Sequence, residues 1–249
     1  MKSEDFSKIA PQYARFRPLY PEALFAYLAS LAPARLLAWD CATGNGQAAI
    51  GLAQYFERVH ATDVSDQQIA NAMPMANVTY HVAPAESSTL DAGTVDLVTA
   101  GQALHWLPFD AFFAEARRVL RPSGVLAAWT YHLPIITPEV DAVVSDHYWN
   151  IVRPYFGPEI QYVDEKYATL PFPGEDIETP EFATNASWML DDLVGFMRTW
   201  SGRQRFMEAH GRDPIDDVLS PLADAWGDAD QPLEIAWKIY VRATRLGTA

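Results

Sequence analysis

A short apolar segment, Leu36–Trp39, runs directly into the glycine-rich stretch Asp40–Gln47, and a segment with helical spacing, Gln47–Phe56, follows it. A strand that turns into a helix within a few residues needs glycine, because glycine adopts left-handed backbone conformations and lets a ligand approach the backbone. The first turn of such a helix also presents unpaired N–H groups to an anionic or carboxylate ligand. The pattern therefore predicts a strand–turn–helix unit with a ligand site at the turn.

The alternation of strand and helix continues through residues 1–133. Apolar residues at helical spacing predict helices over Pro21–Leu31, Gln67–Ala72 and Phe109–Leu120. Short apolar runs between them are typical of buried strands in a parallel sheet, and right-handed crossovers then limit the topology. We expect an α/β fold with a Rossmann-like, doubly wound, mostly parallel sheet and helices on both faces. The further strands are predicted over Arg58–Thr62, Val78–Val82, Val95–Ala100 and Val125–Tyr131.

Residues 134–249 have a less regular pattern. Residues 137–171 are aromatic and acidic, Leu190–Trp200 and Pro214–Trp226 have helical spacing, and Leu233–Thr244 alternates like a strand. We expect one domain overall. Residues 1–133 would form the core with an N-terminal arm, and residues 134–249 a helical, aromatic lid insertion and the closing strands of the same sheet.

Composition narrows the classes of partner. The 249 residues have a net charge of -14, of which -3 falls in residues 1–133 and -11 in residues 134–249. A field of this sign repels phosphate backbones, so no nucleic-acid partner is expected. No segment approaches the roughly 20 apolar residues of a membrane helix, and the first residues have no apolar signal core. Cys41 is the single cysteine, so we expect a cytoplasmic protein without a disulfide or a metal site; the oligomeric state is not readable.

Two carboxylates bear on the choice of ligand. Asp63 follows the second predicted strand, where a carboxylate accepts hydrogen bonds from both hydroxyls of a ribose; a helix cap is the alternative role. Gly44, Gly46 and Ala49 formally meet the dinucleotide pattern G-x-G-x-x-A. Asp40, however, ends the first strand, where its charge would oppose a pyrophosphate and favour a ligand with an ammonium or sulfonium group.

At this point the sequence resembles the class I S-adenosylmethionine-dependent methyltransferases, in the small-molecule branch that includes trans-aconitate methyltransferase-like proteins. The family pattern D-x-G-x-G-x-G maps onto Asp40, Ala42, Gly44 and Gly46, with Ala42 in place of the first glycine. The resemblance covers nearly the whole chain and rests on an ordered set of further motifs. The set comprises residues 62–65 (TDVS) at the ribose acid, 84–86 (PAE) near the adenine, 95–98 (VDLV) running into 102–106 (QALHW), 115–124 (EARRVLRPSG) and the arm at residues 6–21.

The resemblance implies a set of site residues. His105 is the first candidate general base, and His132, just past the fifth predicted strand, is the second. The alternative for His105 is that it and Trp106 only form the pocket wall. In the N-terminal arm, Tyr13 would close an apolar side of the pocket and Arg17 would meet a carboxylate, unless the arm is only a surface segment. The acceptor pocket is expected at His105, Trp106, Tyr131 and His132. Cofactor binding is expected at Tyr13, Arg17, Asp40, Ala42, Thr43, Gly44, Gly46, Gln47, Asp63, Val64, Ala85, Glu86 and Gln102.

The function implied is transfer of a methyl group from S-adenosyl-L-methionine, without a metal, to a small-molecule acceptor, at an oxygen of a carboxylate or hydroxyl, by in-line displacement. S-adenosyl-L-homocysteine would be the product. Three alternatives stay open at this point: a protein or nitrogen acceptor, a nicotinamide or flavin oxidoreductase on the same sheet, and a non-catalytic cofactor-binding protein in which Ala42 marks a decayed site.

Overall fold

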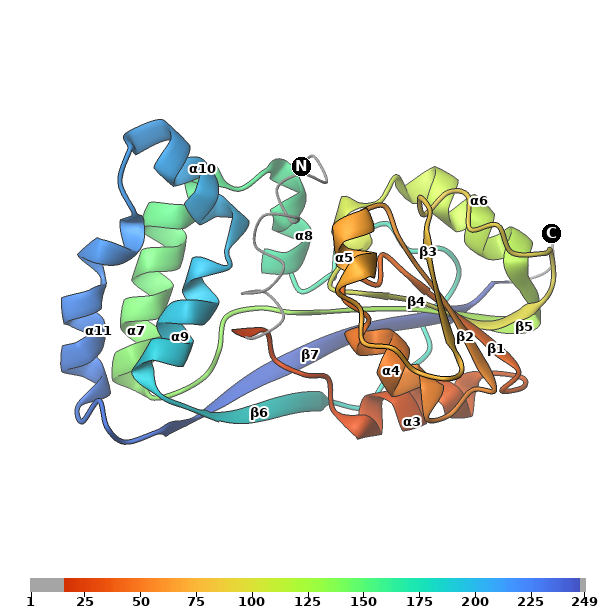
Figure 1. Ribbon diagram of the computed structural model, residues 1–249, viewed down its shortest axis with the longest axis horizontal. Coiled ribbons are helices and arrows are strands. Elements are labelled where there is room, and N and C mark those ends of the chain that lie inside the picture. Colours follow the sequence, from red (N-terminus) through yellow and green to blue (C-terminus); the bar gives the residue numbers. More distant parts are fainter. Residues whose placement is uncertain (1–15, 247–249) are drawn as a thin grey trace.

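Seven strands form one sheet in the order β3–β2–β1–β4–β5–β7–β6 (Figure 1). The computed structural model describes residues 16–246 of the chain. Strands β1 to β5 pair in parallel, β7 is antiparallel to β5, and β6 is antiparallel to β7. The strands are β1 (Leu37–Cys41), β2 (Arg58–Asp63), β3 (Val78–Val82), β4 (Val95–Gly101), β5 (Leu120–Tyr131), β6 (Phe182–Trp188) and β7 (Leu233–Arg245).

The strand order places a switch point at β1. Strand β1 lies between β2 and β4: the chain adds β2 and β3 on one side of β1 and then crosses to add β4 and β5 on the other side. In open α/β sheets, ligands bind outside the carboxyl ends of the strands at such a point. The predicted Rossmann-like, mostly parallel sheet is confirmed, and its geometry directs attention to the turn after β1.

The two faces of the sheet bury alternate residues of each strand. Ala38 packs with α3 (Glu22–Leu31) and α4 (Gln47–Ala53). Its neighbour Trp39 packs on the other face, against Phe112 of α6 (Phe109–Val119). This period of two in a strand that is buried on both faces explains why the strand appears as a continuous apolar run in the sequence.

A second group of helices gathers at one end of the molecule, beyond the carboxyl ends of the parallel strands (Figure 1). We call the segment from residue 133 to residue 232 the lid. Its own core forms around Val140, Leu193, Met197 and Leu222. The lid contains α7 (Pro138–Asp146), a π-helix (His147–Val152), short 3-10 helices (Arg153–Tyr155, Pro158–Ile160 and Pro214–Asp217), α8 (Gln161–Asp164), strand β6, α9 (Leu190–Arg198), α10 (Ser201–His210) and α11 (Leu219–Trp226).

The lid departs from the sequence prediction in several places, and its helices α7, α8 and α10 were not predicted. The helix predicted over Pro214–Trp226 is a 3-10 turn followed by α11, because the Asp213 side chain accepts a hydrogen bond from the Ile215 N–H and closes a separate turn. Strand β6 was not predicted. Its residues alternate between more and less exposed positions with Thr, Asn and Ser among them, so it lacks the apolar run of the central strands.

The remaining elements match the predicted ones within a few residues. Strand β5 begins at Leu120, directly after α6, rather than at Val125. The short helix α5 (Asp66–Ala70) begins one residue earlier than predicted, because the Ser65 side chain accepts a hydrogen bond from the Gln68 N–H and caps it. The boundary predicted after residue 133 falls in the loop that follows β5 and stays a prediction. Over residues 16–246, each helix falls short of the length and apolar character that a membrane crossing requires.

Candidate functional site

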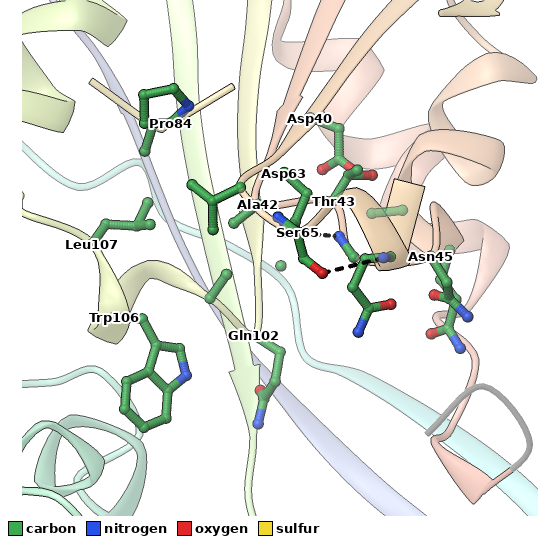
Figure 2. Close-up of a pocket in the computed structure, with 18 of the residues that line it drawn as sticks. Asp40, Ala42, Thr43, Asn45, Asp63, Ser65, Pro84, Gln102, Trp106 and Leu107 are labelled. Atoms are coloured by element: carbon green, nitrogen blue, oxygen red, sulfur yellow. Dashed lines mark hydrogen bonds between the residues drawn. The ribbon is translucent and has the colours of Figure 1, made fainter. Parts of the chain in front are cut away.

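A cavity of about 300 Å³ lies at the carboxyl ends of the parallel strands, and we call it the first cavity. Its wall is built from the turn after β1, the loops after β2 and β3, and the segment after β4. In Figure 2, Asp40, Thr43 and Asn45 lie on one side, while Pro84, Trp106 and Leu107 lie on the other. The ligand site predicted at the glycine turn therefore coincides with a cavity at the switch point.

The turn after β1 has three residues in the left-handed region. The φ angles are +53° at Ala42, +56° at Gly44 and +88° at Gly46. Gly46 also lies against the Tyr80 ring, which a Cβ at this position would strike, whereas a Cβ at Gly44 would meet nothing within 4 Å. Glycine is thus required at Gly46 for packing and at both positions for backbone conformation, and Ala42 adopts the same region at a steric cost.

Asp63 ties the end of β2 to this turn. One carboxylate oxygen accepts a hydrogen bond from the Gly44 N–H at 2.9 Å, and the other accepts one from the Ser65 N–H at 2.9 Å (Figure 2). Burial raises the pKa of Asp63, although the amide hydrogen bonds oppose this rise. The carboxylate also forms part of the cavity wall, so it is placed to accept hydrogen bonds from a bound ligand.

Asp40 is buried at the end of β1. It accepts hydrogen bonds from the hydroxyl of Thr43 at 2.5 Å and from that of Thr99 at 2.8 Å. Burial raises the pKa of Asp40 to about 6, against the opposing effect of these hydroxyls. A positive charge on a ligand nearby would favour the ionised form, as the sequence analysis expects.

Most of the predicted cofactor-binding residues are brought together here. Gly46 does not line the first cavity, since it turns the chain into α4 beneath it, and Tyr13 lies outside the described residues. The residues that do line it are Arg17, Asp40, Ala42, Thr43, Gly44, Gln47, Asp63, Val64, Ala85, Glu86 and Gln102.

A smaller cavity of about 80 Å³ adjoins the first one, and we call it the second cavity. The two share four wall residues: Arg17, Gln102, Trp106 and Tyr131. All four residues predicted for the acceptor pocket line it, namely His105, Trp106, Tyr131 and His132. The rest of its wall comes from the lid: Leu133, Tyr148, Phe156, Ile160, Val163, Phe196, Thr199, Trp200 and Ser201.

Arg17 and Gln102 are positioned by the end of β5. The Arg17 guanidinium donates to the Tyr131 hydroxyl at 3.0 Å and lies 5.3 Å from the centre of the Phe196 ring. The Gln102 side-chain oxygen accepts from the Tyr131 N–H at 2.9 Å. Because both residues line both cavities, a change in either side chain affects the place where the cavities meet.

His105 is buried in the wall of the second cavity. Its Nδ1 lies 2.8 Å from the Tyr167 hydroxyl, and burial lowers the pKa of His105 to about 3. The imidazole is therefore neutral at physiological pH. A group with so low a pKa is a weak general base, because efficient bases have pKa values near the working pH.

Sequence reasoning missed several wall residues. Ser65 and Pro84 lie within the motifs but were not assigned to the site, and Leu107 directly follows the motif at residues 102–106. The lid residues of the second cavity carry no local signal, because their aromatic and apolar side chains also fit a lid core. Within the described part of the chain, no cluster of three or more His, Cys, Asp and Glu side chains is placed to hold a metal ion.

Known proteins with similar sequences support the chemistry of this site. A family model described as a methyltransferase domain matches residues 39–128. A Dictyostelium discoideum protein named as a methyltransferase is 34% identical over 245 residues, which cover 96% of this chain and 93% of that protein. The chain belongs to the S-adenosylmethionine-dependent methyltransferases.

Two further proteins are similar to this methyltransferase over nearly their full lengths. A Saccharomyces cerevisiae protein named as an S-adenosylmethionine-dependent methyltransferase is 25% identical, with 92% of each chain covered. A solved structure from Anaeromyxobacter dehalogenans, described as a type II methyltransferase, has a TM-score of 0.87 and 44% identity, and covers 94% of this chain and 100% of that one.

The family implies binding of S-adenosylmethionine and S-adenosylhomocysteine. The side chains that line the first cavity of the methyltransferase fit such ligands. Two carboxylates, Asp40 and Asp63, lie in the wall of the first cavity, where they would repel a pyrophosphate and suit ribose hydroxyls and a cationic amino-acid moiety. The apolar side chains of Val64, Ala85 and Leu107 offer a surface for an adenine ring. The roles of individual residues stay predictions.

Proposed function

We propose that this methyltransferase acts on a small-molecule acceptor, at an oxygen of a carboxylate or hydroxyl, as the resemblance to the trans-aconitate methyltransferase-like branch implies. The observation that supports the proposal is the second cavity, which shares four wall residues with the first. Its volume is about 80 Å³, on a scale where one water takes roughly 10–15 Å³. An acceptor about the size of a single small ring fits such a space.

The composition of the second cavity also bears on the acceptor. Aromatic side chains dominate its wall, and Arg17, His105 and His132 are its basic residues. A wall of aromatic rings excludes water and holds a small planar molecule, and a guanidinium binds a carboxylate or another electron-rich oxygen. The net charge of -14 speaks against a nucleic-acid acceptor.

The cofactor, when bound, supplies a methyl group already activated by its sulfonium sulfur. The chain itself would bind and orient. Asp63 and the turn after β1 would hold the ribose and the amino-acid end, while Trp106 and Tyr131 would position the acceptor where the cavities meet. Positioning of this kind contributes about 7–11 kcal/mol at its limit, which is why the reaction needs few catalytic groups.

The test begins with calorimetric titration of the protein with S-adenosylhomocysteine and, in parallel, with NADH. Binding of the first alone is the expected result, and binding of NADH alone would support an oxidoreductase instead. Transfer of a labelled methyl group to a panel of small phenols, alcohols, amines and carboxylic acids then identifies the acceptor class. Cofactor binding without transfer to any member of the panel, but with transfer to a protein, would replace the proposal by the protein-acceptor alternative.

A further inference from the structure

Asp164, the last residue of α8, is a buried carboxylate whose side chain is 8% exposed and which bonds His132 and Tyr148, two wall residues of the second cavity. It accepts three hydrogen bonds from different segments. His132 Nε2 lies 3.1 Å and the Tyr148 hydroxyl 2.6 Å from one oxygen, and Arg153 Nε lies 2.5 Å from the other. Burial raises the pKa of Asp164, but these three partners together lower it below its usual range, so the carboxylate is ionised at neutral pH.

His132 directly follows β5 and lines the second cavity. Its Nε2 faces an ionised carboxylate and therefore carries a proton. Among the described residues, its Nδ1 has no hydrogen-bond partner. This arrangement leaves Nδ1 as the nitrogen with a lone pair, in a ring whose orientation is fixed by a carboxylate, which is the arrangement that orients catalytic histidines.

The π-helix fixes the same ring from a second direction. Its consecutive residues Tyr148 and Trp149 both contact the His132 ring, at centroid distances of 5.2 and 5.9 Å. π-Helical turns are rare and are frequently found at functional sites. Burial and the neighbouring carboxylate raise the pKa of Tyr148, so its hydroxyl stays protonated and donates to Asp164.

We propose that His132 is the general base for this methyltransferase, that Asp164 is its positioning residue, and that the acceptor therefore carries a hydroxyl. The inference rests on the proposed function and narrows it, because a carboxylate acceptor is already deprotonated and needs no base. It also moves the role of base from His105, whose imidazole is buried and bonded to Tyr167, to a histidine with a carboxylate partner.

The acceptor oxygen forms a bond to the methyl carbon as the carbon–sulfur bond of the bound cofactor breaks and its electron pair stays on sulfur. The hydroxyl proton moves to Nδ1 of His132, and the imidazolium later releases it to water. Asp164 stabilises the imidazolium, and Arg153, which is paired with the other oxygen of Asp164, weakens that effect. Among the residues that the structure describes, the second cavity has one more charged side chain in its wall, that of Arg17.

A first experiment determines which nitrogen of the His132 ring carries the proton, in the absence of any acceptor. The protein is labelled with isotopic histidine and saturated with S-adenosylhomocysteine, and its imidazole nitrogens are observed by NMR, with His132→Gln identifying the signal. We expect the Nε2–H tautomer in the wild type and a mixture of tautomers in Asp164→Asn. An Nδ1–H tautomer in the wild type would overturn the inference, because the nitrogen that has to accept the proton would already carry one.

A second experiment measures the rate of methyl transfer to phenol and to benzoate, a matched pair of acceptors from the panel described under the proposed function. His132→Gln should lower kcat for the hydroxyl acceptor by about 100-fold or more, with a smaller effect on KM. Asp164→Asn should lower kcat less and move the acid limb of the pH profile to lower pH, which a purely structural role would not do. His81→Gln and Asp217→Asn, two exposed residues outside both cavities, are the matched controls.

The outcomes separate the two proposals. Transfer to hydroxyls that survives in His132→Gln, or transfer confined to carboxylates, rejects the inference and leaves the proposed function intact. Wild-type protein that binds S-adenosylhomocysteine but transfers to no small molecule rejects the proposed function, and the inference falls with it. Melting temperatures of both variants, measured beside the activity, distinguish loss of catalysis from loss of folding.

Discussion

Asp63, at the end of β2, accepts a hydrogen bond from the backbone N–H of Gly44 in the turn after β1, at a distance of 2.9 Å. The two segments lie 19 residues apart in the chain, and this bond fixes the turn relative to the neighbouring strand. The carboxylate thus has a structural role in addition to any ligand contact. Experiments on Asp63 have to separate these two roles.

Replacement of Asp63 should weaken cofactor binding. We expect Asp63→Ala to lower the affinity for S-adenosylhomocysteine at least about tenfold, which corresponds to roughly 1.4 kcal/mol, through the loss of hydrogen bonds to ribose hydroxyls. Calorimetric titration measures the loss, and Asp91→Asn, an exposed carboxylate in a loop, is the control. A second variant, Asp63→Asn, separates the ligand contact from the structural role. An analogue without ribose hydroxyls should bind wild type and Asp63→Asn equally. Unchanged affinity for S-adenosylhomocysteine would remove the ribose assignment.

The buried Asp40 should make stability depend on pH. Its folded-state pKa of about 6 lies above its ordinary value of 3.8, so the folded protein binds a proton that the unfolded chain has released. The contribution of this bound proton to the free energy of unfolding is fully present below the pKa of Asp40 in the unfolded chain. It is lost as the pH rises through about 6. The full effect is on the order of 2–3 kcal/mol.

Unfolding by urea at a series of pH values, with wild type and Asp40→Asn compared, isolates this contribution. The difference in the free energy of unfolding, wild type minus variant, should fall as the pH increases from about 4 to about 7. Subtracting the two free energies of unfolding removes the contributions of titrating groups that do not interact with Asp40, whereas Asp63, whose charge raises the pKa of Asp40, contributes to the difference. A difference that is independent of pH would contradict the raised pKa of Asp40.

The core of the fold was predictable because local sequence and global packing agree there. Strand β3 has the predicted bounds, Val78–Val82, and the turn after β1 lies at the cavity that its glycines imply. Parallel strands buried on both faces produce continuous apolar runs, and the glycine turn marks where the first strand ends. These signals lie within a few residues of one another, so no long-range information is needed.

The second cavity could be predicted only on the side formed by the motif residues. Its other side joins Tyr148 and Phe156 to Thr199 and Trp200, from segments about 50 residues apart that meet only when the lid packs. The choice of His105 over His132 as the first candidate base was limited in the same way, because only local sequence was available. His105 follows a family motif, whereas the partner of His132 is a carboxylate 32 residues away in a short helix that no periodicity reveals.

Arg17 should matter more for binding than its neighbour Arg15, which lies outside the described residues. Arg17 lines both cavities and donates to the Tyr131 hydroxyl, so Arg17→Ala should weaken S-adenosylhomocysteine binding about tenfold or more, the range for a lost charge-assisted hydrogen bond. Arg17→Lys should have an intermediate effect, since lysine keeps the charge and loses the planar fork. Equal losses in Arg17→Ala and Arg15→Ala, measured by calorimetry, would contradict the assignment.

Ala42 offers a test of backbone strain at the cofactor turn. Its φ of +53° is a conformation that costs an alanine about 1–2 kcal/mol and a glycine almost nothing. After allowance for the greater freedom of glycine in the unfolded chain, Ala42→Gly should raise the free energy of unfolding by roughly 1 kcal/mol and the melting temperature by about 2–4 °C. Its affinity for S-adenosylhomocysteine should be at least as high as that of the wild type.

The matched control is Ala142→Gly on the exposed face of α7, where the backbone is helical and glycine costs about 1 kcal/mol. The two substitutions are chemically identical, so opposite signs of the stability change isolate the backbone conformation as the cause. If Ala42→Gly destabilises the protein as much as Ala142→Gly, the alanine at the first motif position is not strained. If it stabilises the protein but weakens cofactor binding, the alanine methyl group itself contributes to the site, and the departure from the family pattern has a function in binding.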